Sequence, residues 1–223
     1  MSLTVQKLHP ALRAGLRLTI AGSNSPMFSF QGSFDSSCAL HAAAMALAIH
    51  QCMPNPLRPA SRHSTEQLEF MRRAGAFWHD GISLAQLSHL LEQLHLGLRP
   101  RHFEGSHSDV IQFCTQHVLK GCPVILSFRE WHRTTRHAAL VVGVEGQQLS
   151  RALRPHTLLV IDSAECEPCL AAYNARLTWC SDDASASTRA LYETPFGRSK
   201  IVVVGAIAVK KRRPRTNRCD KPP

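Results

Sequence analysis

Cys38 stands where a loop sequence gives way to a helix-forming sequence. The segment "FSFQGSFDSSC" is rich in serine, glycine and aromatic residues, whereas "ALHAAAMALAI" directly after it is rich in alanine. The N-terminus of a helix carries unpaired N–H groups and partial positive charge, which favour the thiolate form of a cysteine. The position therefore favours a nucleophilic Cys38, and a small buried core residue is the alternative explanation.

A nucleophilic thiol needs a base and a group that orients the base. His137 opens the apolar segment "HAALVVGV" after the polar loop "REWHRTTR", and Asp162 ends the next apolar segment, "TLLVIDS". If the two segments are antiparallel neighbours in a sheet, the start of the first lies beside the end of the second. Asp162 would then adjoin His137, where a carboxylate fixes the tautomer and stabilises the imidazolium.

Gln31, seven residues before Cys38, is a candidate oxyanion donor together with the backbone N–H of Cys38. Other polar residues have structural explanations. Asp35 precedes the helix and suits a turn, and His132 lies in a polar loop where we expect it to be solvated. His41, one helical turn after Cys38, is expected on the surface of the helix.

The elements that must position these residues fall into two groups. Alanine content, apolar periodicity and capping signals predict helices in the first half, whereas β-branched runs predict strands after residue 122. Helices followed by strands predict an α+β fold, in which a helical layer packs on an antiparallel sheet. The expected helices are 38–51, 64–73 with a capping box from Ser64 to Gln67, the segment that follows Ser83, and 108–119; the strands are "CPVILSF", "HAALVVGV", "TLLVIDS" and "SKIVVVGAIAV".

The order of these residues, with the cysteine opening a helix and the histidine and aspartate on consecutive strands, resembles the papain-like cysteine peptidases. Within them the chain is most similar to the bacterial peptidases that process double-glycine leader peptides, and to their relatives. The resemblance covers about residues 30–164 and rests on "QGSFDSSCALHAAAMAL", "GISLAQLSHLLEQLHLGLRP", "GCPVILSF" and "HAALVVGVEG...LLVIDSA".

The resemblance implies a papain-like fold and a role for each of four residues. Cys38 would be the nucleophile, His137 the general base and acid, Asp162 the orienting residue and Gln31 an oxyanion-hole donor. Two features depart from the family pattern: Ala39 follows the cysteine in place of the usual glycine, and the glutamine precedes the cysteine by seven residues instead of six.

The charge of the chain is concentrated at its C-terminus. Residues 210–223 hold seven basic residues and one acidic residue, which account for +6 of the net charge of +10. The length of 223 residues suits one domain, and we assign residues 1–209 to it and 210–223 to a basic, disordered tail. We expect contact with nucleic acid only through this tail.

Eight cysteines would suit a disulfide framework, but nothing in the N-terminal sequence resembles a signal peptide and no apolar run reaches transmembrane length. We therefore expect a cytoplasmic protein with free thiols and no membrane contact. Cys166 and Cys169 have zinc-ligand spacing, with His156 and Cys180 as further candidates, but a second closely spaced pair is missing. We expect no metal and no cofactor, and interpret the pair as a loop at the cleft or a redox-sensitive dithiol.

Three functions fit the sequence. The first is a cysteine peptidase that hydrolyses a peptide or isopeptide bond in a peptide or protein substrate. The second is an acyltransferase or transglutaminase-like enzyme with the same residues, and the third is a non-catalytic binding module with a basic tail. Arg129, Arg133 and Arg136 favour an acidic or carboxylate-bearing partner. Residues 1–27 suit either an inhibitory segment across the cleft or a segment packed on the sheet, and the sequence does not indicate the oligomeric state.

Overall fold

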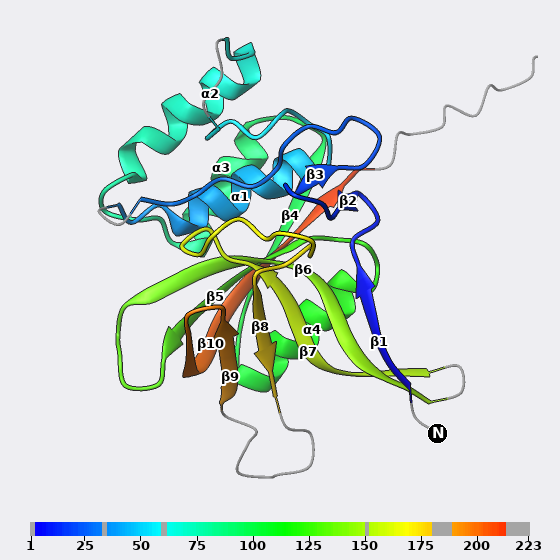
Figure 1. The fold of residues 1–223 in the computed structure, drawn as a ribbon. Coiled ribbons are helices and arrows are strands. Elements are labelled where there is room, and N and C mark those ends of the chain that lie inside the picture. Colours follow the sequence, from blue (N-terminus) through cyan, green and yellow to red (C-terminus); the bar gives the residue numbers. More distant parts are fainter. Residues whose placement is uncertain (1–2, 33–34, 59–61, 150–151, 180–188, 213–223) are drawn as a thin grey trace, which may run out of the picture.

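A computed structural model describes residues 3–32, 35–58, 62–149, 152–179 and 189–212. It combines four α-helices and one 3-10 turn with a large antiparallel sheet in the described part of the chain (Figure 1). The helices are α1 (Cys38–Ile49), α2 (Thr65–Ala74), η1 (Gly75–Phe77), α3 (Leu84–Gln93) and α4 (His107–Val118). The strands are β1 (Leu3–Leu8), β2 (Leu12–Arg13), β3 (Thr19–Ile20), β4 (Leu98–Glu104), β5 (Val124–Glu130), β6 (Arg136–Leu149), β7 (Ala152–Ile161), β8 (Ala175–Thr178), β9 (Ala190–Thr194) and β10 (Gly197–Lys211).

The main sheet closes into a barrel. Strands β6, β5, β10, β9, β8 and β7 pair in that order, and β7 pairs again with β6. The two longest strands also pair beyond the barrel, β6 with β1 and β10 with β4. The main sheet is antiparallel, as expected, but its closure was not predicted from the sequence. Closure has a physical reason, since it leaves fewer strand edges unpaired.

Helices cover the sheet on two sides, so the prediction of one helical layer packed on the sheet is not confirmed. Helix α1 packs on one side, where Ile125 and Leu140 join its hydrophobic cluster. Helix α4 packs into the other cluster, which takes residues such as Leu126 and Val141 from the barrel strands. Because neighbouring residues of β5 and β6 are apolar on both faces, both faces need cover.

Helix α1 is the central helix of the fold. Every residue from Ala39 to Ile49 is buried, so the helix is enclosed on all sides. Its many alanines allow the surrounding segments to approach the backbone closely. The capping box predicted from Ser64 to Gln67 at the start of α2 is confirmed, and so is Ser83 as the residue that caps α3, where Gln86 completes a second capping box.

Both ends of the described chain belong to the sheet system. Strand β1 pairs with β6, and residues 3–27 do not line the cleft described below. Packing on the sheet therefore holds for residues 3–8, whereas Leu18, Ile20 and Met27 pack in the hydrophobic cluster around α1. Strand β10 runs to Lys211, and the backbone N–H of Arg212 donates to Gly97 O at 2.7 Å. The expected boundary at residue 210 therefore falls inside a strand, because Lys210 and Lys211 pair with β4. The rest of the predicted tail, residues 213–223, lies outside the described residues.

Six of the strands in the described ranges were not anticipated: β2 and β3, which pair with each other, and β1, β4, β8 and β9, which join the main sheet. The last four are short or rich in charged and polar residues, and they form because longer apolar strands provide an edge to pair with. In the described ranges, none of the helices is long and apolar enough to cross a membrane.

Candidate active site

Cys38 is the first residue of α1 and lies half-buried in a cleft, as the sequence predicted for its position. The turn before it is stabilised by Asp35, whose Oδ1 accepts hydrogen bonds from the Ser37 N–H, at 3.1 Å, and from the Ser37 hydroxyl. The other oxygen of Asp35 accepts from the Gly32 N–H at 3.2 Å. Asp35 is therefore a turn residue, as expected, and it fixes the path of the chain into the helix.

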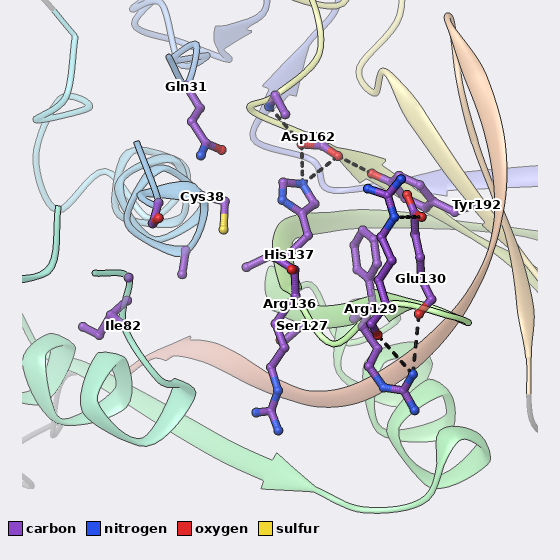
Figure 2. Close-up of a pocket in the computed structure, with 18 of the residues that line it drawn as sticks. Gln31, Cys38, Ile82, Ser127, Arg129, Glu130, Arg136, His137, Asp162 and Tyr192 are labelled. Atoms are coloured by element: carbon purple, nitrogen blue, oxygen red, sulfur yellow. Dashed lines mark hydrogen bonds and ion pairs between the residues drawn. The ribbon is translucent and has the colours of Figure 1, made fainter. Parts of the chain in front are cut away.

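His137 and Asp162 are neighbours because β6 and β7 pair antiparallel, with Leu140 opposite Ile161. Nε2 of His137 lies 2.8 Å from Oδ1 and 2.9 Å from Oδ2 of Asp162. The other ring nitrogen lies on the side of Cys38 (Figure 2), and the interaction with Cys38 is one of the causes that raise the pKa of the ring. The predicted adjacency of the histidine and the aspartate is confirmed, and their arrangement orients the imidazole toward the thiol.

Asp162 is buried, and its carboxylate has two further anchors besides His137. Oδ2 accepts from the Tyr192 hydroxyl at 2.6 Å and Oδ1 from the Ala164 N–H at 2.9 Å. The backbone on either side of the carboxylate is held by Asn174, whose Oδ1 accepts from the Asp162 N–H and whose amide donates to the Asp162 carbonyl. The position of this carboxylate is therefore fixed from several directions.

Neither Tyr192 nor Asn174 could be identified from sequence patterns. Each lies in or next to a short strand, β9 or β8, that sequence patterning did not identify. The polar turn after Asp162 pointed only to the end of a strand. Closure of the barrel brings Asn174, 12 positions after Asp162, to the backbone of Asp162, and it brings Tyr192, 30 positions after, to the carboxylate.

The environment of the histidine favours its charged form. Burial lowers the pKa of His137, but the hydrogen bond that the ring donates to Asp162 and the interactions with the charges of Asp162 and Cys38 outweigh burial and raise the pKa from 6.5 to about 10. Burial raises the pKa of Asp162, but the bonds from His137 and Tyr192 outweigh it, so that the pKa is lowered. Burial and the charge of Asp162 hold the pKa of Tyr192 well above 10, so its hydroxyl remains a donor.

Gln31 lies at the cleft beside Cys38 (Figure 2). One donor of its side-chain amide is engaged, because Nε2 donates to the Asp35 carbonyl at 3.0 Å. Its backbone N–H donates to the Ser163 carbonyl at 2.8 Å, which ties the loop before α1 to the end of β7. The amide has a second N–H, so the geometry is compatible with a donor at the cleft.

The cleft has a volume of about 930 Å³. It contains the arginines at 129, 133 and 136 on one wall, together with acidic residues such as Asp80 and Glu165. Arg133 pairs with Glu130 at 2.9 Å, and Arg129 donates to loop carbonyls. Arg136 is exposed, and its guanidinium contacts no partner within the described ranges (Figure 2). The cleft is therefore mixed in charge, with one unpaired arginine next to His137.

His132 and His41, the two other histidines considered in the sequence analysis, lie in different environments. His132 is exposed, lies outside the cleft and contacts the ring of Trp131, in agreement with the expected solvated loop. His41 is buried, so its expected position on the helix surface is wrong. The reason is that α1 is enclosed: one ring nitrogen of His41 lies 2.9 Å from the Ser29 hydroxyl, and the ring contacts Trp78.

Cys166 and Cys169 lie exposed in the loop that follows β7, and neither lines the cleft, although Glu165 next to them does. The described ranges contain no group of three His, Cys, Asp or Glu side chains arranged to hold a metal ion. Cys180, which was a candidate fourth ligand, lies outside the described residues.

Comparison with known proteins gives a distant structural match and no sequence relative. No family model and no curated protein matches the chain. Among solved structures, the chain is similar to UfSP from C. elegans, with a TM-score of 0.44 and 14% identity. The match covers 93% of this chain but only 37% of the UfSP chain. A similarity of this degree identifies neither the activity nor the substrate of the protein.

Proposed function

We propose that the protein is a cysteine peptidase that hydrolyses a peptide or isopeptide bond through an acyl-enzyme. In this proposal Cys38 is the nucleophile, His137 the general base and acid, Asp162 the orienting carboxylate and Gln31 an oxyanion donor. One observation carries the proposal: the ring of His137 bonds both oxygens of Asp162 through Nε2 and turns its other nitrogen toward Cys38 at the start of α1.

The first half of the proposed reaction forms the acyl-enzyme. His137 holds the proton of Cys38, and the resulting thiolate attacks the carbonyl carbon of the substrate. The tetrahedral oxyanion accepts hydrogen bonds from the Cys38 backbone N–H and the Gln31 amide. When the C–N bond breaks, the proton on His137 moves to the leaving amine, and the acyl group remains on sulfur.

The second half returns the enzyme to its starting state. Neutral His137 removes a proton from water, the hydroxide attacks the thioester, and the C–S bond breaks to release the acid and the thiolate. Asp162 stays ionised and stabilises the imidazolium in both halves, and the Tyr192 hydroxyl is placed to keep it so. An amine in place of water would give the acyltransferase reaction through the same thioester.

The first test is the pH dependence of alkylation at Cys38. Iodoacetamide labelling, read by peptide mass spectrometry, is compared in the wild-type protein and in His137→Ala. We expect Cys38 to react rapidly well below pH 8.5, the ordinary pKa of a free thiol being about 8.5, and to lose this reactivity in the variant. The exposed Cys166 and Cys169 are internal controls, because they share the reagent and the fold.

Labelling of Cys38 no faster than that of Cys166, in the wild-type protein and in His137→Ala alike, would overturn the proposal.

Turnover is then tested with a mixed peptide library, with products identified by mass in the presence and absence of added hydroxylamine. Cleaved acids that require Cys38 support hydrolysis, whereas products found only as hydroxamates support acyl transfer. Cys38→Ser is the control for contaminating peptidases, because it preserves the size of the side chain.

A further inference from the structure

A second cavity, of about 920 Å³, lies away from the cleft on the β4–β10 strand pair and beside α4. It shares no lining residue with the cleft. We call it the basic cavity, because six of its eight lining residues are basic. It is lined by Arg99, Pro100, Arg101, His117, Ala208, Lys210, Lys211 and Arg212.

The pairing of β4 with β10 brings these cations together. Arg99 lies directly opposite Lys210, and Arg101 lies opposite Ala208. Because side chains alternate along a strand, Arg99 and Arg101 share one face of β4. This is the face toward α4, since Phe103, two residues further along, stacks on Phe113 of that helix. Strands and helix thus form a common cationic wall.

No acidic residue lines this cavity to balance the charge. Arg101 lies over the ring of Phe113, at 5.9 Å, and the Lys211 ammonium donates to the His50 carbonyl. Within the described part of the chain, the side chains of Arg99, Lys210 and Arg212 have no hydrogen-bonding or ionic partner. Three permanent cations at one cavity are therefore without a counter-charge.

Neither strand pairing nor the dipole of α4 explains why so many cations gather at this cavity. Like charges directly opposite on paired strands destabilise a sheet, which is the situation of Arg99 and Lys210. Cations near the C-terminus of α4 stabilise the helix dipole, but among the residues that line the cavity only His117 belongs to the last turn of that helix. Burial lowers the pKa of His117, and Arg101, Lys120 and Lys210 add to this effect, as expected for a site with excess positive charge.

We propose that the basic cavity binds a compact polyanion that carries two or more phosphate groups. Arginine side chains recognise phosphate through paired N–H donors, and lysine supplies a point charge. A carboxylate carries a single charge, so an acidic peptide would need five acidic side chains to neutralise the five permanent cations of the cavity. Two or three phosphates supply this charge in a small volume, and the cavity falls in the size range of ligand sites.

The test is isothermal titration calorimetry of the full chain with inorganic tripolyphosphate at constant ionic strength. We expect saturable binding at one site, and weakening by about tenfold in Arg101→Gln, the loss expected for one charge-assisted hydrogen bond. Arg99→Gln, which removes no contact within the described protein, should weaken binding similarly. Arg154→Gln is the matched control, because Arg154 is exposed on β7 and the substitution makes the same change in charge.

Several outcomes would overturn the proposal. Absence of saturable binding, or equal weakening by Arg154→Gln, would mean that only the overall charge attracts the anion. Tighter binding of a glutamate-rich peptide, or of a short single-stranded oligonucleotide, would assign the cavity to a different class of partner. Loss of binding on deletion of residues 213–223, with no effect of Arg99→Gln or Arg101→Gln, would place the contact in the C-terminal segment.

Discussion

The two sides of the candidate active site are held in different ways. On the sheet side, His137 and Asp162 are fixed by the register of β6 and β7, and Asp162 is anchored by Tyr192 and by the Ala164 N–H. On the helix side, the contacts are mostly local: Gln31 and Asp35 bond to groups within four residues, and the main distant tie is a backbone bond from Gln31 to Ser163.

This difference has a functional consequence. The orientation of the imidazole depends on long-range packing, so a change there should affect the chemistry even where the fold survives. The helix side, where we propose the oxyanion donors, depends on a short loop whose backbone N–H donors remain when a side chain is removed. Substitutions on the sheet side should therefore have the larger effects, and the predictions below test this ranking.

The largest effect is expected for Asp162→Asn. The amide can no longer stabilise an imidazolium and can hold the wrong tautomer, so kcat/KM should fall by on the order of 10³- to 10⁴-fold. The measurement is turnover of the best library peptide, with circular dichroism to check folding. Asp80→Asn is the matched control, because Asp80 also lines the cleft and the change is identical. Equal losses in both variants would contradict the orienting role of Asp162.

A smaller effect is expected for Gln31→Ala. Loss of one oxyanion donor should lower kcat by about 10²-fold. Alkylation of Cys38 by iodoacetamide forms no oxyanion, so its rate should be unchanged. If alkylation and hydrolysis fall together, Gln31 acts by holding the loop through the Asp35 carbonyl instead.

Tyr192→Phe should have a still smaller effect. The phenylalanine keeps the ring packed in the barrel but removes the hydrogen bond to Asp162, which should lower kcat/KM by about tenfold. Tyr173→Phe removes a hydroxyl that contacts Gln6 at the surface and should leave activity unchanged. A wild-type rate in Tyr192→Phe would mean that the remaining anchors suffice for Asp162.

The smallest effect concerns stability. The pKa of His137 is about 10 in the folded protein and about 6.5 in the unfolded chain. The charged histidine therefore makes its full contribution to stability below about pH 6.5, and this contribution is lost as the pH rises toward about 10. The lowered pKa of Asp162 means that its contribution is lost as pH falls below about 4. The difference in unfolding free energy between wild type and His137→Gln, measured with urea, should therefore be largest between about pH 4 and 6.5. A difference that grows above pH 8 would contradict the ion pair.

The cleft and the basic cavity also differ in how well their residues could be predicted from the sequence. The residues of the cleft could be found because each stands at the edge of a strongly patterned segment: Cys38 before an alanine-rich run, and His137 and Asp162 at the ends of apolar runs. The basic cavity was not found, because Arg99 and Arg101 lie in a strand with weak patterning, and their proximity to Lys210 depends on the pairing of β4 with β10.

The sequence by itself determined the local structure and the neighbourhood of three site residues. The capping residues at 64 and 83, the start of α1 at Cys38 and the two apolar strands that carry His137 and Asp162 follow from short-range patterns, whose physical basis is backbone hydrogen bonding and side-chain period. The sequence made the proximity of His137 and Asp162 conditional on antiparallel pairing, which the structure confirms. Tertiary structure alone decided the closure of the barrel, the separation of α4 from the other helices, and the burial of His41. It also brought Tyr192 and Asn174 to Asp162, because contacts between distant residues depend on how apolar faces pack, which local pattern does not encode.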